Sequence, residues 1–316
     1  MSTILNFICK TCEVVYFEKL DSHTYPSFYQ ELKDADGILG SGQKVDHEFL
    51  QRARRLKIVS NISVGYDNLD IPELTNRNVL ATNTPGLLND TVADTIFGLI
   101  LATARRIPEL NQFVKDGNWK SQIGESLFGI DVHHKTLGII GMGGVGTTIA
   151  KRAHFGFDMS ILYHNRSRHL EAEQIFNATD CSLEELCEQS DFICLMTPLT
   201  PNTEKLIGEK EFKLMKKTAI FVNGSRGATV DEDALVRALE NKDILAAGLD
   251  VLAQEPVRPD HPLLSMDNVV TLPHIGSATK ETRLKMAQLA AENLVTGLQG
   301  KTPSCLINPG VLVRSK

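Results

Sequence analysis

The sequence lacks the features of a membrane protein or a nucleic-acid-binding protein. Its longest apolar stretch, around Ile96 to Ala102, is far shorter than the roughly 20 residues that span a bilayer. The N-terminus has no basic segment followed by an apolar core, as a secretory signal would have. Acidic residues outnumber basic ones: the chain has 39 aspartates and glutamates and 33 lysines and arginines, which gives a net charge of -6. We therefore expect a cytoplasmic protein with neither a membrane nor a nucleic-acid partner.

Metal-binding and redox motifs are also scarce. The six cysteines are scattered, apart from the pair Cys9 and Cys12. No second CxxC and no His-x-x-x-His completes a zinc set, and no helical pattern begins at Cys9 and Cys12 as a thioredoxin-type site requires. We expect reduced, incidental thiols and no metal ion.

The chain of 316 residues exceeds the length at which one hydrophobic core usually stops growing, about 250 to 300 residues. Two domains are therefore expected. Short apolar strands alternate with polar-faced helices, which is typical of parallel sheets covered by helices. The strands expected in the first half are Thr3 to Ile8, Gly37 to Leu39, Lys57 to Ile62 and Val79 to Thr82, with a helix at Asp46 to Arg54.

The most informative segment is the glycine run Gly141-Met-Gly-Gly-Val-Gly146, which follows an apolar strand, Thr136 to Ile140. A helix and a second strand, Met159 to Tyr163, come next. In such a βαβ unit the first glycine permits the tight turn, the second lets the backbone approach a pyrophosphate, and the third allows close packing of helix on strand. The segment predicts a dinucleotide-binding fold that starts mid-chain, so a separate α/β domain precedes it.

The residues after the second strand indicate which dinucleotide is bound. Asn165 stands nineteen residues after Gly146, where a carboxylate would hold the ribose 2′-hydroxyl, and Arg166, Ser167 and Arg168 follow it. A carboxylate would repel a 2′-phosphate, whereas an arginine makes charge-assisted bonds to it. We therefore expect NADPH as cofactor, with NAD as the alternative if these arginines are only solvated.

Further strands are expected at Phe192 to Met196, Thr218 to Val222, Ile244 to Leu249 and Val269 to Leu272, with a capping box at Ser182 to Glu185 and a final helix at Ala278 to Leu298. Ligands of an open parallel sheet bind beyond the carboxyl ends of its strands. Arg226, Asp250 with Glu255, and His274 each follow one of these strand ends. They are the candidate chemical groups.

Reduction of a 2-oxoacid needs these side-chain types. Arg226 suits the carboxylate and carbonyl oxygens, because its planar fork binds both and stays charged. His274 suits the general acid, and a hydrogen bond that its ring donates to Glu255 would raise its pKa toward working pH. The turn Ser63-Val-Gly65, after the expected strand Lys57 to Ile62, could cradle the substrate carboxylate with backbone N–H groups.

A long helical segment, Thr91 to Lys115, precedes the glycine run, with Asp90 as its expected N-cap. Its apolar residues are too many for one solvent-facing stripe. It is therefore either buried between domains or packed on another subunit. The C-terminal tail is expected to return to the first domain, which gives two crossings and suits a hinge.

The chain resembles the D-isomer-specific 2-hydroxyacid dehydrogenases over nearly its whole length, and among them the bacterial glyoxylate and hydroxypyruvate reductases. The resemblance rests on specific segments, including Ser63 to Asn68, Asp90 to Asp94, Asp131 to Gly138, Arg152 to Phe157, Ala246 to Asp250 and Pro273 to Thr279. It implies Arg226, Glu255 and His274 as the catalytic set, Asp250 as the holder of the nicotinamide carboxamide, and Thr91 near the cofactor. It also implies a homodimer through the long helical segment.

The expected fold is thus α/β, with two doubly wound parallel-sheet domains: a flavodoxin-like substrate domain, residues 1–98 and 287–316, and a Rossmann dinucleotide-binding domain, residues 99–286. The expected cofactor-binding residues are Thr91, Gly141, Met142, Gly143, Gly144, Val145, Gly146, Asn165, Arg166, Ser167, Arg168, Pro198, Asn223, Gly224, Asp250 and Gly276. The expected substrate-binding residues are Ser63, Val64, Gly65, Arg226 and His274.

The resemblance implies an NADPH-preferring reductase of glyoxylate, hydroxypyruvate or 2-ketogluconate. Two alternatives stay open, an NAD-dependent enzyme of the phosphoglycerate dehydrogenase type and a catalytically idle NAD-sensing binding protein. Three segments depart from the family pattern: Ser225 beside Arg226, Val251 to Glu255 without an aromatic residue, and the loop Pro85 to Leu88. The last is expected to line the substrate pocket, so the reaction class is better defined than the substrate.

Overall fold

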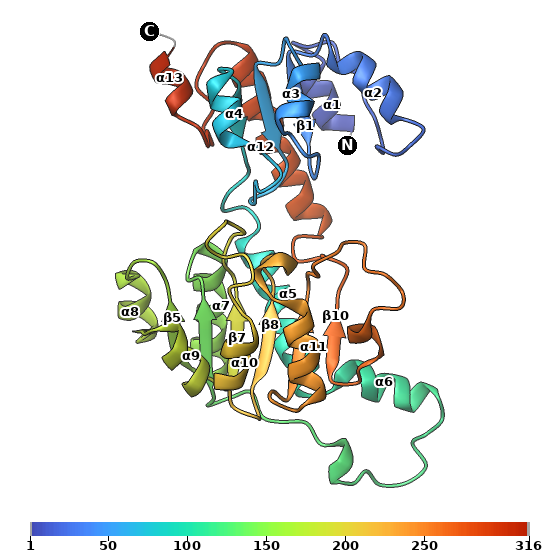
Figure 1. Cartoon of the computed structure of the whole chain (residues 1–316), viewed down its shortest axis with the longest axis vertical. Coiled ribbons are helices and arrows are strands. Elements are labelled where there is room, and N and C mark those ends of the chain that lie inside the picture. Colours follow the sequence, from blue (N-terminus) through green and yellow to red (C-terminus); the bar gives the residue numbers. More distant parts are fainter. Residues whose placement is uncertain (1, 315–316) are drawn as a thin grey trace. The chain divides into compact units, whose positions relative to one another are not determined.

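The computed structural model describes residues 2–314, which fold as two compact units (Figure 1). The first unit holds the chain up to Leu88 and from Thr279 onward, and the second runs from Asn89 to Ala278. The boundaries expected from the sequence, at residues 98/99 and 286/287, fall inside two helices, α5 (Asn89–Ala104) and α12 (Lys280–Leu298). The units divide at the starts of these helices, because α5 packs as a whole in the second unit and α12 as a whole in the first.

The first unit is built on a parallel sheet in the order β1-β2-β3. Its strands are β1 (Gly37–Gly40), β2 (Ile58–Asn61) and β3 (Leu80–Thr82). Its helices are α1 (Ser2–Ile8), α2 (Tyr25–Leu32), α3 (His47–Arg52), α4 (Ile71–Asn76), α12 and α13 (Gly310–Arg314). The three strands run in sequential order, without the strand-order reversal that a flavodoxin-like sheet has.

The prediction of a strand over Thr3 to Ile8 is wrong, because this segment is helix α1. Ile4 and Ile8 are both buried and stand four residues apart, on one helical face. They pack with Ala291 and Leu294 of α12. A short apolar run fits both periodicities, and the neighbouring helix decides between them.

The predicted return of the C-terminal tail to the first unit is confirmed. The Asn308 side chain accepts a hydrogen bond from the Ala81 N–H at 2.9 Å and donates one to the Val79 carbonyl at 2.9 Å. Leu306 forms an antiparallel bridge with Thr82. The tail therefore covers the edge of the sheet beyond β3.

The second unit contains a seven-stranded parallel sheet in the order β10-β9-β8-β7-β4-β5-β6. The strands are β4 (Thr136–Ile140), β5 (Ser160–His164), β6 (Thr179–Asp180), β7 (Phe192–Leu195), β8 (Ile220–Asn223), β9 (Ala246–Leu249) and β10 (Val269–Thr271). The strand order reverses between β4 and β7, which creates the switch point where such sheets bind ligands. The expected α/β class with parallel sheets is confirmed.

Helices cover both faces of this sheet (Figure 1). One face carries α5 and α7 (Gly144–Phe157), which pack on each other. The other carries α9 (Leu183–Gln189), α10 (Glu209–Leu214) and α11 (Glu232–Glu240), which bury a core around Leu186, Phe212, Phe221 and Leu235. The unit also contains α8 (Leu170–Phe176) and the short 3-10 helices η1 (Glu125–Leu127), η2 (Gly227–Thr229) and η3 (Pro262–Ser265). The capping box predicted at Ser182 and Glu185 starts α9, as expected.

The expected helical segment Thr91 to Lys115 is two helices, α5 and α6 (Ile107–Lys115). Arg106 between them has a φ of 54°, in the left-handed region that breaks a right-handed helix. Helix α5 begins at Asn89, so Asp90 lies in its first turn and is not the N-cap. Most apolar residues of α5 are buried within the second unit, whereas α6 has no buried residue.

The described residues contain no helix that is both long and apolar enough to cross a membrane.

Candidate active site

The glycine loop between β4 and α7 has the shape that a dinucleotide requires. Gly141 has a φ of +101°, and a Cβ on it would come within 2.9 Å of the Met196 backbone. A Cβ on Gly146 would lie 2.5 Å from the Gly141 carbonyl oxygen. Gly143, in contrast, faces open space, with no atom within 4 Å of such a Cβ. The first and third glycines are needed for packing, and the second leaves room for a pyrophosphate at the start of α7.

Two other residues of this loop have structural contacts. Met142 is buried, and Gly144 lies so close to Asn89 that a Cβ would meet its amide nitrogen at 2.6 Å. Val145 is half-buried in the first turn of α7. The loop is thus held by α5 on one side and by the strand ends on the other.

Asn165 connects the end of β5 to the glycine loop. Its side-chain oxygen accepts a hydrogen bond from the Met142 N–H at 2.7 Å. The side-chain amide donates to the Met142 carbonyl at 3.4 Å. The residues that follow Asn165 are therefore placed beside the phosphate-binding turn, as the predicted ribose end of the site requires.

The two arginines after Asn165 have different surroundings. Arg168 binds Glu173 of α8 with both Nε, at 3.0 Å, and Nη2, and this pairing raises its pKa. Arg166 is exposed and, across residues 2–314, has no ion-pair partner. Ser167 between them is exposed as well. The structure therefore brings one guanidinium to a carboxylate and leaves the other open to solvent.

The turn after β8 fixes the backbone of Arg226. The buried Asn223 side chain accepts from the N–H and the hydroxyl of Ser225, at 3.0 and 2.8 Å, and donates to the Arg226 carbonyl at 3.1 Å. The Ser225 hydroxyl also lies 3.1 Å from that of Thr229. The departure from the family pattern at Ser225 is thus absorbed by local hydrogen bonds.

Two further expected cofactor residues lie at neighbouring strand ends. Gly224 packs against Ile96 of α5, since a Cβ would come within 2.2 Å of the isoleucine Cδ1. Pro198 is exposed after β7, and its carbonyl accepts a hydrogen bond from the Thr203 hydroxyl at 2.6 Å. Gly224 thus has a packing role of its own, whatever it contributes to a cofactor.

Asp250, directly after β9, holds the turn that carries His274. Its two carboxylate oxygens accept hydrogen bonds from the N–H groups of Ile275 at 2.8 Å and Gly276 at 2.9 Å, and its carbonyl accepts from the His274 N–H at 2.9 Å. Burial raises the pKa of Asp250, and the two N–H bonds oppose that rise. His274 itself has a φ of 53°, a strained conformation that these three bonds maintain.

His274 and Glu255 form the predicted pair. The Nδ1 atom of His274 lies 2.8 Å from Oε2 of Glu255. This hydrogen bond raises the pKa of His274, and burial opposes the rise. For Glu255, burial acts to raise the pKa, but hydrogen bonds from His274 and from the Leu252 N–H hold it below its usual value. The pair is therefore favoured as carboxylate and imidazolium.

Arg226 belongs to the same cluster. A Cβ on Gly227 would lie 2.0 Å from the Leu252 carbonyl carbon, so the Arg226 turn lies directly against the loop that carries Glu255. The positive charge of Arg226 acts to lower the pKa of Glu255, and it opposes the rise in the pKa of His274. The structure thus brings the three expected catalytic side chains together at the carboxyl ends of the strands.

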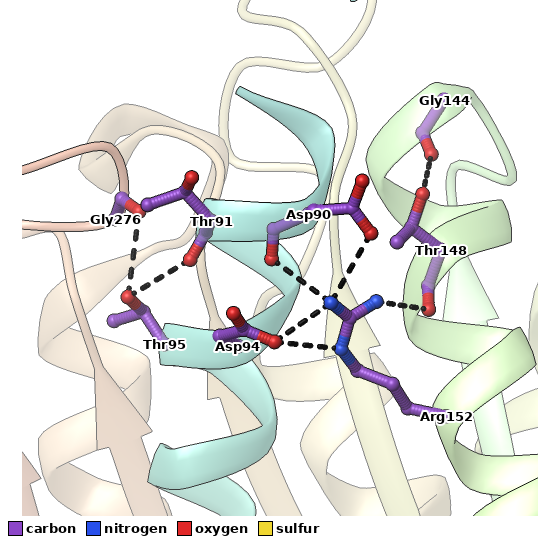
Figure 2. A network of polar contacts seen from close by, with 8 residues as sticks. All are labelled: Asp90, Thr91, Asp94, Thr95, Gly144, Thr148, Arg152 and Gly276. Atoms are coloured by element: carbon purple, nitrogen blue, oxygen red, sulfur yellow. Dashed lines mark hydrogen bonds and ion pairs between the residues drawn. The ribbon is translucent and has the colours of Figure 1, made fainter. Parts of the chain in front are cut away.

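The first turns of helix α5 lie beside Gly276, two residues after His274 (Figure 2). The Thr95 hydroxyl donates to the Thr91 carbonyl at 3.2 Å and lies 3.4 Å from the Gly276 carbonyl. On the other side of α5, Arg152 of α7 binds Asp94 at 2.7 Å and Asp90 at 3.2 Å. Thr91 and Gly276 are therefore neighbours, and the helix that starts at the glycine loop is tied to α5.

The expected substrate loop Ser63-Val-Gly65 lies in the first unit. The carbonyl of Ser63 accepts from the Thr84 N–H at 2.9 Å, and that of Val64 accepts from the Asn83 side chain at 2.8 Å. The carbonyl of Gly65 accepts from the Asn61 side chain at 3.0 Å and from the Ser63 hydroxyl. Within the described chain, the N–H groups of Val64 and Gly65 donate to no protein acceptor, as an anion-binding turn requires.

Sequence reasoning missed two supporting residues. Glu173 on α8, which pairs with Arg168, was not among the expected site residues, because a spacing of five residues does not by itself predict a contact. Thr95 was missed as well, because its contact with Gly276 joins positions 181 residues apart. Only the tertiary structure shows that second contact.

Comparison with known proteins shows which family the chain resembles. The family model described as D-isomer specific 2-hydroxyacid dehydrogenase, NAD binding domain, matches residues 97–276. The chain is 53% identical over 278 residues to a glyoxylate/hydroxypyruvate reductase B from Escherichia coli O6:H1. The aligned residues cover 88% of this chain and 86% of that protein.

Two solved structures extend the comparison. An NADPH-dependent glyoxylate/hydroxypyruvate reductase from Sinorhizobium meliloti, in complex with NADP and malonate, is similar with a TM-score of 0.85, 31% identity, and coverage of 97% of this chain and 93% of that one. A D-lactate dehydrogenase from Aquifex aeolicus, complexed with NAD and lactic acid, has a TM-score of 0.87, 26% identity, and coverage of 96% and 95%.

Proposed function

The chain belongs to the D-isomer specific 2-hydroxyacid dehydrogenase family, and on this premise we propose that it reduces small 2-oxoacids to D-2-hydroxyacids with NADPH as the preferred cofactor. It is an oxidoreductase, and its second unit is the NAD-binding domain of that family. The observation that carries the proposal is the 2.8 Å contact of His274 with Glu255 beside Arg226, at the ends of three neighbouring strands.

The bound nicotinamide cofactor supplies the hydride, and the three side chains manage charge and proton. Arg226 binds the carboxylate and carbonyl oxygens of the 2-oxoacid with its planar fork. Glu255 occupies Nδ1 of His274, which leaves Nε2 as the ring atom that donates a proton to the carbonyl oxygen. The hydrogen bond to Glu255 raises the pKa of His274 and so favours the protonated ring. Asp250 maintains the turn that carries the ring, and it would also accept a hydrogen bond from the nicotinamide carboxamide.

The glycine loop would hold the cofactor, since Gly143 leaves room for a pyrophosphate and the exposed Arg166 is available to a 2′-phosphate. Met142, Gly144 and Val145 shape this loop, while Thr91, Pro198, Asn223, Gly224 and Gly276 line the nicotinamide half. An exposed arginine where a carboxylate would hold the ribose hydroxyl supports NADPH over NADH. On the first unit, the N–H groups of Val64 and Gly65, which donate to no acceptor among residues 2–314, are proposed to form an anion-binding turn.

The substrates follow from the named relative. Glyoxylate and hydroxypyruvate are the first candidates, and 2-ketogluconate is a third. The test is steady-state reduction of all three by the purified protein with NADPH and with NADH, alongside oxidation of 3-phosphoglycerate. Higher kcat/KM for glyoxylate or hydroxypyruvate with NADPH supports the proposal. Faster turnover of 3-phosphoglycerate with NAD, or binding of cofactor without turnover of any of these acids, contradicts it.

We further propose that the protein is a homodimer assembled through α6 and the loop after it. This arm, residues 107–128, extends away from the seven-stranded sheet (Figure 1) and exposes five large apolar side chains: Ile107, Val114, Trp119, Ile123 and Phe128. Arg106 closes its base by binding Glu109 at 2.6 Å and the Ser126 carbonyl at 2.6 Å. An apolar surface held in place in this way is typical of an interface.

Sedimentation equilibrium tests the dimer. Trp119→Glu is expected to give monomers at micromolar concentration, whereas Val313→Glu, at another exposed apolar site that lies outside the arm, leaves the mass unchanged. A wild-type monomer contradicts the proposal.

The expected location is the cytoplasm, because all six cysteines are free thiols, as is usual in a reducing compartment. Fractionation of cells that express the protein tests this.

A further inference from the structure

The two arginines expected to contact a 2′-phosphate are not equivalent. Arg168 is held by a carboxylate in a two-bonded fork with Glu173, whereas Arg166 is open to solvent. A guanidinium that already binds a carboxylate must give up those bonds before it can bind a phosphate. Breaking the bonds to Glu173 costs free energy, so a phosphate that binds Arg168 gains less binding free energy than one that binds an unpaired arginine.

Glu173 is unusually well fixed for a residue at a helix start. Its side chain is only 18% exposed, and its Oε1 accepts a hydrogen bond from the buried Tyr163 hydroxyl at 2.6 Å. Tyr163 comes from β5, so the carboxylate is anchored to the sheet and does not depend on α8 alone. A carboxylate fixed in this way pays little conformational entropy to hold Arg168, unlike an ordinary surface ion pair.

The group also lies at the phosphate end of the glycine loop. The His169 ring, which caps α8 by accepting the Ala172 N–H at 3.2 Å, has its Nε2 atom 3.4 Å from the Thr147 hydroxyl in the first turns of α7. Asn165, three residues before Arg168, binds the backbone of Met142. Glu173 and Arg168 are therefore joined through short contacts to the segment where the ribose is expected.

We propose that Glu173 is a specificity-determining residue that withholds Arg168 from the 2′-phosphate and so limits the preference for NADPH over NADH. Arg166 is then the single arginine that recognises the phosphate, and Arg168 does not contact the phosphate while it is paired with Glu173. This inference rests on the proposed NADPH function and adds to it that the preference is held below the value that two free arginines would give.

The test measures cofactor binding and not turnover. Dissociation constants of NADPH and NADH are determined by fluorescence titration of the full-length protein, and adenosine 2′,5′-bisphosphate and 5′-AMP are compared as competitors. Glu173→Gln keeps an acceptor for the Tyr163 hydroxyl but removes the charge. It is expected to raise the NADPH/NADH affinity ratio by about three- to tenfold, because Arg168 gains a charge-assisted bond to phosphate. The bisphosphate should gain by the same factor over 5′-AMP.

Two comparisons isolate the mechanism. Glu171→Gln removes an equal charge from the same turn of α8 and is expected to change the ratio by less than about twofold, since Glu171 is exposed and unpaired among the described residues. Arg168→Gln in the native background is also expected to have little effect. In the double variant of Arg168→Gln and Glu173→Gln, the gain from the glutamate change should vanish.

Several results overturn the proposal: an unchanged ratio in Glu173→Gln, a gain that persists without Arg168, an equal gain in Glu171→Gln, or a large loss in Arg168→Gln alone. The measurement on Arg168→Gln alone remains a valid test even if the Glu173→Gln variant folds poorly. Arg166→Gln tests the underlying function separately. If that variant does not lower the ratio, the NADPH assignment fails and the inference that rests on it fails too, whereas an unchanged ratio in Glu173→Gln alone overturns only the role of Glu173.

Discussion

The Nδ1 atom of His274 lies 2.8 Å from Oε2 of Glu255, and this contact decides which atom of the ring can act. A carboxylate accepts and cannot donate, so the ring proton on Nδ1 is committed to Glu255. Nε2 is left to face a substrate oxygen. The same contact explains the raised pKa of His274, since the negative charge favours the imidazolium.

Replacement of His274 by asparagine removes the proton donor but keeps a polar side chain of similar reach. We expect kcat for 2-oxoacid reduction to fall about 10²- to 10⁴-fold, the usual contribution of positioned acid catalysis, with the NADPH dissociation constant changed much less. Steady-state kinetics and a fluorescence titration measure the two effects. The acid role would be refuted by a turnover rate within a factor of two of the wild type.

The pH dependence follows from the sign of the shifts. Reduction needs the protonated ring, so the rate falls as pH rises through the raised pKa of His274. Glu255→Gln removes the main cause of the rise, and the falling limb of kcat/KM should move to lower pH, toward the ordinary histidine value of about 6.5. A limb that does not move would show that another group sets it.

The same pair affects folding stability in a defined window. Its contribution is lost as pH rises through the raised pKa of His274, and also as pH falls through the lowered pKa of Glu255. Thermal melts of the wild type and of Glu255→Gln should therefore differ most at mildly acidic pH, between the ordinary pKa values of glutamate and histidine of about 4.3 and 6.5, and converge at both extremes. A constant difference across the whole range would contradict this linkage.

Asp250→Asn tests the clamp on the His274 turn. The carboxylate accepts from two N–H groups, and an asparagine side chain offers only one oxygen. We expect a loss of about 1 to 3 kcal/mol in stability from the unsatisfied N–H, and a drop in kcat of about tenfold or more, since a misplaced acid loses its geometry. Asp267→Asn, at an exposed site, is the control and should behave as wild type.

Two glycines of α7 provide a matched pair. A Cβ on Gly146 would meet the Gly141 carbonyl at 2.5 Å, whereas one on Gly156 would meet nothing within 4 Å. Gly146→Ala should weaken cofactor binding and lower the melting temperature, because the loop must shift. Gly156→Ala should leave binding unchanged and stabilise the protein by roughly 0.5 to 1 kcal/mol, as in other exposed helices. Equal behaviour of the two variants would contradict the packing role of Gly146.

Much of the second unit follows from local patterns. The strand Thr136–Ile140, the glycine run and the capping box at Ser182 and Glu185 are determined by neighbouring residues, so their periodicity and turn chemistry suffice to predict them. The cluster of Arg226, Glu255 and His274 was also predictable, because parallel strands place their carboxyl ends at one edge of a sheet.

Other features depended on contacts between distant segments. Ser2–Ile8 is a helix because α12, nearly 300 residues later, receives its apolar face. The break at Arg106 depends on one left-handed residue inside an otherwise helical sequence. Neither is encoded in a short window, since an apolar run fits helix and strand alike.

The sequence by itself determined the chemistry of this protein: a glycine loop for a dinucleotide, and an arginine, a glutamate and a histidine at strand ends for a 2-oxoacid. Residue types and spacing suffice for that, because they specify which bonds and charges are available. Only the tertiary structure decided how those charges are paired. It placed Glu255 on His274, Asp250 under the turn of Gly276, and Glu173 on Arg168, since such contacts depend on packing and not on order along the chain.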